Sequence, residues 1–488
     1  MAPIHRRHFL KLGLAASLLT ALPARLGAAI RRGTSQVLGD ASNLLQVPVH
    51  KHLIVEKSDE SELFAVLRRE LKSAASEKRP VAVSAARHSM GGQSLPANGT
   101  AITLENPVLD IDSAAKQCRM SAGARWHQVI RHLDKSGFSP AVMQSNSDFG
   151  VGSTFCVNAH GWPVPYGPFG STVRSIRLML HDGTILRCSR AENAELFKLS
   201  MGGYGLFGII LDLDVDIVAN QFLKPTVVTM PAENFADYFV KQANDPAVSM
   251  AYGRLEIARK TFFREAVAVS YRAAPEPEEG LPSVEDGGVM SFLSRKVYRA
   301  QIGSEWAKRQ RWRIESSIAP KLTSGAATRN TLMAEPVANL AGRDKDRTDI
   351  LHEYFVPPEG LAAFVAACRE IIPRSPLEFL NITLRYVDAD QDSVMTFAPS
   401  LRIAGVMSFS QRRNHEGDED EMRRVTQALI DAAQQAGGSF YLPYRLHATR
   451  EQLMQTYPRT GHFVSRKRHY DPGLVFRNIM WDTYFAEG

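Results

Sequence analysis

Cysteine is scarce in this sequence: the 488 residues contain only Cys118, Cys156, Cys188 and Cys368. None of them belongs to a Cys-x-x-Cys pair, so the spacing excludes the common zinc and dithiol centres, and we expect no metal site. Four cysteines in a chain of this length also exclude a disulfide framework. We expect free thiols, although the pattern allows one disulfide.

Apolar runs long enough to span a bilayer, which takes about 20 residues, are absent as well. Residues 12–24 are apolar, but they follow the basic stretch Arg6–Lys11 (Arg-Arg-His-Phe-Leu-Lys) and precede small residues at 27–29. This order is typical of a cleaved export signal, and the paired arginines resemble the twin-arginine signal. We predict a signal peptide over residues 1–28, export to the periplasm, and no integral membrane span in the mature chain. An anchoring N-terminal helix is the alternative.

Acidic residues are slightly outnumbered, with 51 Asp+Glu against 58 Lys+Arg and a net charge of +7. Such an excess can indicate a nucleic-acid or anionic-membrane partner. Cleavage after Ala28 would remove Arg6, Arg7, Lys11 and Arg25 and no acid, which lowers the net charge to +3. No basic stripe with interleaved aromatics remains, so we expect no nucleic-acid partner.

Two common phosphate-binding motifs are missing, because no Gly-x-Gly-x-x-Gly opens a helix ahead of an acidic residue and no Walker lysine is present. Glycine-punctuated segments occur instead at residues 87–94 (Arg-His-Ser-Met-Gly-Gly-Gln-Ser), 151–167 and 200–210. The first follows a predicted strand at 81–83, where small residues allow backbone N–H groups to converge on phosphate oxygens. The third has four glycines within residues 202–208 ahead of an apolar strand, which indicates close backbone approach to a flat or bulky group.

The remaining sequence mixes helical and strand periodicities, which favours an α+β fold in two unlike blocks. We place one domain at residues 45–218, a second at 219–440, and a C-terminal return at 441–488. Helices are predicted at 61–73, 126–135, 359–372 and 418–436. The polar, weakly patterned residues 323–347 predict a loop or lid.

Together, the three glycine segments resemble the FAD-binding half of the vanillyl-alcohol oxidase superfamily, the PCMH-type flavoproteins. The likeness is greatest to aldonolactone oxidases and alditol oxidases, and the His-Ser-x-x-Gly-Gln stretch is also similar to cytokinin dehydrogenases. The resemblance implies a two-subdomain PCMH-type FAD-binding domain plus a cap domain with an antiparallel sheet flanked by helices. The FAD-binding residues that it implies are Ala86, Arg87, His88, Ser89, Gln93, Ser94, Val151, Gly152, Ser153, Thr154, Asn158, Ala159, His160, Gly161, Gly203, Gly205, Gly208, Ile209, Ile210 and Asn478.

In covalent members of that superfamily the histidine of the first loop is bonded to the flavin, so the resemblance implies covalent FAD through His88. The chain departs from the pattern at Phe149, which interrupts the glycines of the second loop, and at residues 162–165 (Trp-Pro-Val-Pro), which replace a Gly/Ser run. Non-covalent FAD held by the same loops is the alternative.

Two further segments, one in the second block and one in the C-terminal return, resemble the substrate-binding part of these enzymes. Residues 383–390 resemble the strand that places an arginine over the flavin, and residues 441–447 resemble a segment in which a lysine faces the substrate. We therefore take Arg385 and Arg445 as the groups that stabilise developing negative charge near the substrate oxygen and near flavin N1–C2=O, and His447 as the general base. A surface arginine and a packed histidine are the alternatives. Thr383 stands where alditol oxidases have glutamate, so the substrate need not be a simple polyol.

The leading hypothesis is an exported FAD-dependent oxidoreductase. It would oxidise a CH–OH group of a small-molecule substrate, a sugar, polyol or aldonolactone, by hydride transfer to flavin N5, and then pass electrons to oxygen or a respiratory electron acceptor. One alternative is a flavin dehydrogenase of another alcohol or an amine, with a quinone or cytochrome as acceptor. A non-catalytic flavin-fold binding protein is the other.

Overall fold

The structure is a computed structural model. It describes residues 36–56, 59–278, 280–284, 298–318, 327–335, 344–415 and 417–486. The described residues all belong to one unit, residues 32–488. The signal peptide predicted over residues 1–28 lies outside them.

A parallel sheet in the order β3–β5–β4 forms the first layer. Its strands are β3 (Lys51–Val55), β4 (Val81–Ser84) and β5 (Thr100–Leu104), and a hairpin of β1 (Gln36–Gly39) and β2 (Gln46–Val49) precedes them. Helix α1 (Glu60–Ser76) connects β3 to β4 and buries Leu63, Leu67 and Leu71, which recur every four residues on one face. Its N-terminus is capped by Asp59, which accepts a hydrogen bond from Glu62 N at 2.9 Å. This layer supports the first glycine segment, which leaves β4.

An antiparallel sheet in the order β10–β9–β11–β7–β6 forms the second layer, and β8 pairs with the end of β11. The strands are β6 (Leu109–Asp112), β7 (Gln117–Ser121), β8 (Phe138–Pro140), β9 (Val173–Met179), β10 (Ile185–Ser189) and β11 (Ile209–Ala219). The helices are α2 (Trp126–Asp134), α3 (Val151–Cys156) and α4 (Ala194–Ser200). The β9–β10 hairpin closes at Gly183, whose φ of +85° requires glycine-like freedom.

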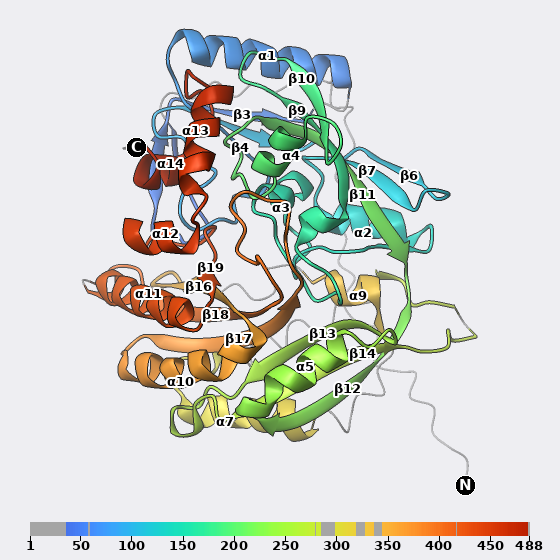
Figure 1. Ribbon diagram of the computed structural model, residues 1–488, viewed down its shortest axis with the longest axis vertical. Helices are drawn as coiled ribbons and strands as arrows, with labels where there is room; N and C mark the ends of the chain where they lie inside the picture. The colour runs from blue at the N-terminus through green and yellow to red at the C-terminus, as the bar shows by residue number, and fades with distance from the viewer. Residues whose placement is uncertain are drawn as a thin grey trace, which may run out of the picture. The chain divides into compact units, whose positions relative to one another are not determined.

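A larger antiparallel sheet, which we call the cap sheet, follows in the order β15–β12–β14–β13–β17–β18–β16–β19. Its strands are β12 (Phe222–Pro231), β13 (Val248–Leu255), β14 (Glu265–Ala273), β15 (Ala327–Thr328), β16 (Arg347–Val356), β17 (Glu378–Val387), β18 (Arg402–Arg412) and β19 (Ser439–Phe440). The helices are α5 (Phe235–Ala243), α7 (Glu305–Arg313), α9 (Arg329–Met333), α10 (Leu361–Ile371) and α11 (Asp418–Gln435). Figure 1 shows α5 along β13 and β14, and α10 and α11 beside the other half of the sheet. The predicted antiparallel sheet flanked by helices is confirmed.

The C-terminal residues form α12 (Arg450–Thr456), α13 (Thr460–Tyr470) and α14 (Ile479–Tyr484), and the stretch between α13 and α14 returns to the first layer. Phe476 pairs with Val81 of β4 in a parallel bridge. Asp471 fixes this return, because its carboxylate accepts hydrogen bonds from Val475 N at 2.9 Å and Phe476 N at 2.8 Å. Buried Lys467 completes the arrangement with a salt bridge to Asp471.

The structure differs from the expectations in two places. Within the predicted loop 323–347, residues 327–333 form β15 and α9, because Thr328 caps the helix by accepting a hydrogen bond from Thr331 N at 3.1 Å. Most of that predicted loop lies outside the described residues. Helix α7 was not expected; Ser304 caps it by accepting from Ala307 N at 3.2 Å, and Trp312 anchors it in the interior.

The four cysteines are free thiols in the structure. Burial raises the pKa of Cys118, Cys156 and Cys188 to about 12, which keeps those thiols protonated near neutral pH. Over the described ranges, every helix is too short or too polar to traverse a bilayer.

Candidate functional site

The three glycine segments converge in the structure. Asn478 joins the first to the third, since its Nδ2 donates to Gln93 O at 2.7 Å and to Tyr204 O at 3.2 Å. Tyr204 N donates to Cys156 O at 2.8 Å and so joins the third to the second. The three predicted loops therefore form one site. It lies where the first two layers, which make up the predicted flavin domain (residues 45–218), meet the C-terminal return.

The first segment is a turn at the exit of β4 that begins at Ala86. Arg87 adopts a left-handed φ of +53° and directs its guanidinium toward Thr103, at 3.3 Å. His88 stacks on Phe149, which lies just ahead of the second segment, with ring centroids 4.3 Å apart and planes 29° apart. Burial lowers the pKa of His88, against the opposing charge of Asp148, so its imidazole is mainly neutral near pH 7. A neutral imidazole has the free nitrogen lone pair that a covalent bond to a cofactor would need.

Other predicted side chains tie the loops together instead of pointing to a ligand. Gln93 Oε1 accepts from Gly91 N at 2.9 Å, and its Nε2 donates to Leu442 O and Tyr444 O. Thr154 accepts from Trp126 Nε1 at 2.8 Å. Asn158 Nδ2 donates to Asp390 at 3.0 Å, while its Oδ1 accepts from Gly170 N at 2.8 Å. Their role is to fix the loop backbone.

Glycines bring the backbones of these loops close to their neighbours. A Cβ at Gly161 would lie 1.9 Å from Met143 O, so a side chain there would require the backbones at Gly161 and Met143 to move apart. The remaining predicted positions lie beside these contacts: Ser89 in the first turn; Val151, Gly152 and Ser153 at the start of α3; Ala159 before His160; Gly203, Gly205 and Gly208 in the third segment; Ile209 and Ile210 at the start of β11.

Several buried polar atoms at this junction have no hydrogen-bond partner among the described residues. They are Ser94 Oγ, Ser145 Oγ, Ser200 Oγ, Arg125 Nη1 and His160 Nδ1. Unpaired buried polar atoms are costly and in native proteins usually have a partner. Hydroxyl and guanidinium groups suit the phosphates and ribose of a flavin nucleotide. The residues present therefore fit FAD.

A polar cluster joins the second segment to the cap sheet. His160 Nε2 donates to Glu353 Oε1 of β16, and both side chains are buried. Tyr444 OH donates to Glu353 Oε2 at 2.9 Å. Burial raises the pKa of Glu353, but the combined effect of His160, Arg385 and Tyr444 holds that pKa below its ordinary value. Glu353 is therefore a carboxylate near neutral pH. We call His160, Glu353, Tyr444 and Arg385 the junction cluster.

Arg385 contributes a cation that no carboxylate neutralises through a hydrogen bond. Its Nε is buried and has no hydrogen-bond partner within the described ranges. Burial lowers the pKa of Arg385, although Glu353 opposes the shift, and a guanidinium stays protonated in either case. Such a group can stabilise a negative charge that forms beside it.

The other two predicted catalytic residues lie in a separate network against α11. Arg445 forms a salt bridge with Glu419, and His447 Nε2 donates to the same carboxylate at 2.9 Å. His447 Nδ1 lies 3.1 Å from Thr426 Oγ1, which is itself 3.2 Å from His352 Nε2. We call these residues the α11 cluster. Arg385 is thus linked to the second segment through Glu353 and His160, whereas the side chains of Arg445 and His447 contact α11.

Glu353 is a site residue that the sequence reasoning missed. The available signal was a glutamate directly before the apolar residues Tyr354, Phe355 and Val356 of β16. Such a residue needs a buried partner, and that partner, His160, is 193 positions away.

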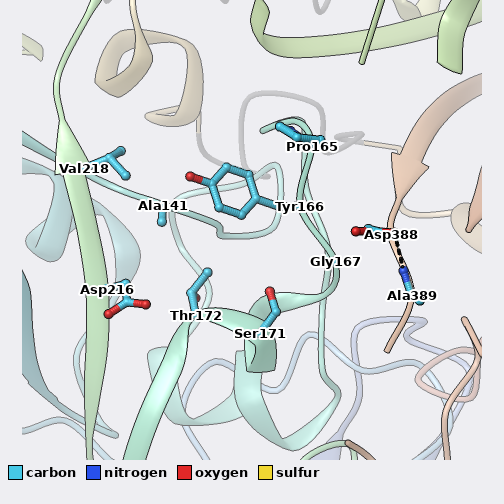
Figure 2. A pocket seen from close by; sticks show the side chains of 10 residues that line it. All are labelled: Ala141, Pro165, Tyr166, Gly167, Ser171, Thr172, Asp216, Val218, Asp388 and Ala389. Atoms are coloured by element: carbon cyan, nitrogen blue, oxygen red, sulfur yellow. Dashed lines mark hydrogen bonds between the residues drawn. The ribbon is translucent and has the colours of Figure 1, made fainter. Parts of the chain in front are cut away.

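A separate cleft of about 380 Å³ opens between the flavin domain and the end of β17 (Figure 2). Tyr166 lies across it, with its hydroxyl directed toward Ala141 and Val218, above Ser171 and Thr172. None of the predicted flavin or catalytic residues lines this cleft.

Comparison with known proteins gives one family match, to the FAD binding domain, over residues 55–189. L-gulonolactone oxidase from Mus musculus is 31% identical over 121 residues, 25% of this chain and 28% of the relative. Cytokinin dehydrogenase 4 from Oryza sativa subsp. japonica is 29% identical over 161 residues, 31% of this chain and 30% of the relative. Cytokinin dehydrogenase 2 from Arabidopsis thaliana is 31% identical over 133 residues, 27% of this chain and 26% of the relative. The matches thus span less than a third of each of these relatives.

Proposed function

We propose that this chain, which contains a PCMH-type FAD-binding domain with FAD as its cofactor, is an exported oxidoreductase acting on a CH–OH group of a sugar, polyol or aldonolactone. The match over residues 55–189 confirms the predicted superfamily and cofactor. The substrate class is drawn from the resemblance to aldonolactone and alditol oxidases, and the relative named L-gulonolactone oxidase supports it.

The observation that carries this proposal is the position of Arg385. Its Nε, which has no partner among the described residues, and the carboxylate of Glu353 belong to a cluster that contacts the flavin loop through His160. A hydroxyl that loses its proton during oxidation needs both a cation to hold the resulting charge and a group to receive the proton. The junction cluster contains both kinds of group.

The residues of the three segments would hold FAD, through the backbone of residues 86–89, the hydroxyls of Ser94 and Ser200, and Arg125. Bound flavin would supply the hydride acceptor at N5. The buried aromatic rings of Phe355, Phe397 and Tyr441 surround His160 and would exclude water from the reacting atoms.

A flavin spectrum and anaerobic reduction test the function directly. Purified protein should absorb as oxidised flavin, and its visible bands should bleach under argon with at least one member of a panel of aldonolactones, alditols and sugars. A protein without flavin, or one that no CH–OH donor bleaches, would be inconsistent with the proposal. Hydrogen peroxide formation in air, compared with dye reduction under argon, then distinguishes an oxidase from a dehydrogenase.

We also propose covalent FAD attachment through His88, supported by the neutral imidazole held against Phe149. Yellow colour should remain with acid-precipitated wild-type protein and be released from His88→Ala. His50→Ala, at an exposed histidine outside the loops, is the matched control and should keep its colour. Complete release from the wild type would indicate non-covalent FAD.

Export rests on the sequence of residues 1–28. Replacing both Arg6 and Arg7 by lysine preserves the charge but removes the arginine pair, so the precursor should accumulate in the cytoplasm. Cell fractionation with an antibody against the mature chain measures this, and unchanged export would count against the twin-arginine route.

A further inference from the structure

We propose that His160 is the general base of the reaction, with its Nδ1 receiving the hydroxyl proton of the substrate, and that Glu353 is its positioning residue. This inference rests on the proposed function and assigns the step that removes the proton. His160 lies in the second flavin segment, whereas Glu353 lies in the cap sheet, so the pair forms where the two domains meet.

The geometry fixes the tautomer of His160. Because Glu353 is a carboxylate, it can only accept, and His160 Nε2 must be the donor. In the neutral ring the lone pair is then on Nδ1, which is buried and has no hydrogen-bond partner within the described part of the chain. A carboxylate that fixes one nitrogen while the other faces the reaction is the arrangement that orients a histidine base.

Arg385 lies on the same face of the cap sheet as Glu353. Thr383 and Glu353 are both paired with Val406 of the intervening strand β18, so all three side chains project to one face. Arg385 is two residues beyond Thr383 and therefore projects to that face as well. The base and the charge-stabilising guanidinium thus approach the flavin loop from the same side.

The step balances within the proposed half-reaction. The O–H bond of the substrate breaks and its proton goes to His160 Nδ1, and bound flavin would supply the acceptor for the hydride released from the C–H bond. The C–O single bond becomes C=O, so the donor is oxidised by two electrons, which the flavin would accept. Arg385 stabilises the alkoxide character that develops on the oxygen before the hydride leaves.

His447, the base expected from sequence, is less suited to this role. Each of its ring nitrogens already lies within hydrogen-bonding distance of a protein group, Glu419 Oε1 at 2.9 Å and Thr426 Oγ1 at 3.1 Å. A proton could reach His447 only after one of these contacts breaks.

The test measures the rate of flavin bleaching under argon, with the best donor, in wild type, His160→Asn and His160→Ala. We expect both variants to lose about 10²–10⁴-fold, and added imidazole to restore part of the rate to His160→Ala. Flavin content and the dissociation constant of the reaction product, read from the flavin spectrum, should stay close to wild type. His352→Gln is the matched control, because the neighbouring buried histidine contacts Tyr354 and Thr426 instead; its rate should stay within about twofold.

Glu353→Gln tests the positioning role through the pH profile. The rate should rise with pH as the base loses its proton, and removal of the negative charge should move that rise to lower pH. The charged or titratable groups that face His160 in this test are Glu353 and Arg385 of the cap sheet and Tyr441 and Tyr444 of the C-terminal segment. A structural role alone would lower the rate without moving the profile.

Three results would overturn the assignment: wild-type rates in His160→Asn, loss of flavin in the His160 variants without imidazole rescue, or an unmoved profile in Glu353→Gln. These outcomes differ from a failure of the proposed function, in which wild-type protein itself binds no flavin or is bleached by no donor.

Discussion

Among the described residues, two histidine–glutamate pairs use the same chemistry in different surroundings: His160, Glu353 and His447 are buried, and Glu419 is half-buried. In the junction cluster, His160 contacts Glu353, and its Nδ1 has no partner within the described ranges. In the α11 cluster, His447 contacts Glu419, and Thr426 lies beside its second nitrogen. The first pair spans the flavin loop and the cap sheet, whereas the second lies between α11 and the C-terminal segment.

This difference separates a reactive arrangement from a structural one. The clusters differ at the histidine, because Arg445 Nε, like Arg385 Nε, has no partner among the described residues. A histidine with both nitrogens paired helps to hold its surroundings rigid, because each group would lose a partner if it moved. A buried atom without a partner costs free energy and suggests a ligand that is absent from the protein itself. We therefore expect substitutions in the junction cluster to lower the reaction rate and substitutions in the α11 cluster to lower stability.

The largest expected effect comes from the same substitution at an arginine in each cluster. Arg385→Met should lower the rate of flavin reduction by about 10²–10³-fold, because the charge on the substrate oxygen loses its stabilising cation. Arg445→Met should leave that rate within about tenfold of wild type, but it removes the salt bridge to Glu419 and should lower the melting temperature. Rapid-mixing absorbance and differential scanning fluorimetry measure the two effects. If Arg445→Met instead lowers the rate of flavin reduction and Arg385→Met lowers only the melting temperature, the assigned roles of the two clusters are wrong.

The next effect is on stability. His447→Asn leaves Glu419 and Thr426 without their ring partner, so we expect the free energy of unfolding to fall by about 1–3 kcal/mol. Urea titration followed by fluorescence measures the change. Flavin reduction in the folded variant should persist, and its disappearance would return His447 to the role of base.

Acid should destabilise the α11 cluster through His352. Burial lowers the pKa of His352 from 6.5 to about 3, so the unfolded chain binds the proton more readily than the folded one. The stability that the neutral ring contributes is complete above pH 6.5 and is lost as pH falls toward 3, by up to about 1.4 kcal/mol per pH unit. Urea titrations at pH 7, 6, 5 and 4 measure this slope, and His352→Gln should flatten it. An equal slope in the variant would assign the loss to other groups.

The sequence predicted local elements better than the site. Helices α1 and α11 follow from periodicity and from the apolar face of each helix, which are properties of neighbouring residues. The return of residues 471–478 to β4 and the convergence of the glycine segments were expected from family resemblance, since their contacts join positions hundreds of residues apart.

The partners of single polar side chains could not be predicted from periodicity. Gln93 and Asn158 carry groups able to bind a cofactor, and only the structure shows that loop carbonyls, amides and Asp390 already occupy them. Likewise, the division of His160 and His447 between two clusters depends on which element lies opposite each residue, β16 for His160 and α11 for His447. That choice is made by the packing of the cap sheet against the flavin domain.

The smallest expected effect concerns Tyr444, which is adjacent to Arg445 in sequence but belongs to the other cluster. Its hydroxyl donates to Glu353 Oε2 at 2.9 Å, while His160 holds the other oxygen. Tyr444→Phe removes one donor and keeps the ring, so the rate of flavin reduction should fall roughly fivefold, as expected for a hydrogen bond of about 1 kcal/mol. The melting temperature should change little, because the Glu353–His160 contact remains. A large loss of stability with an unchanged rate would place Tyr444 with its neighbour in the structural group and would weaken the boundary between the two clusters.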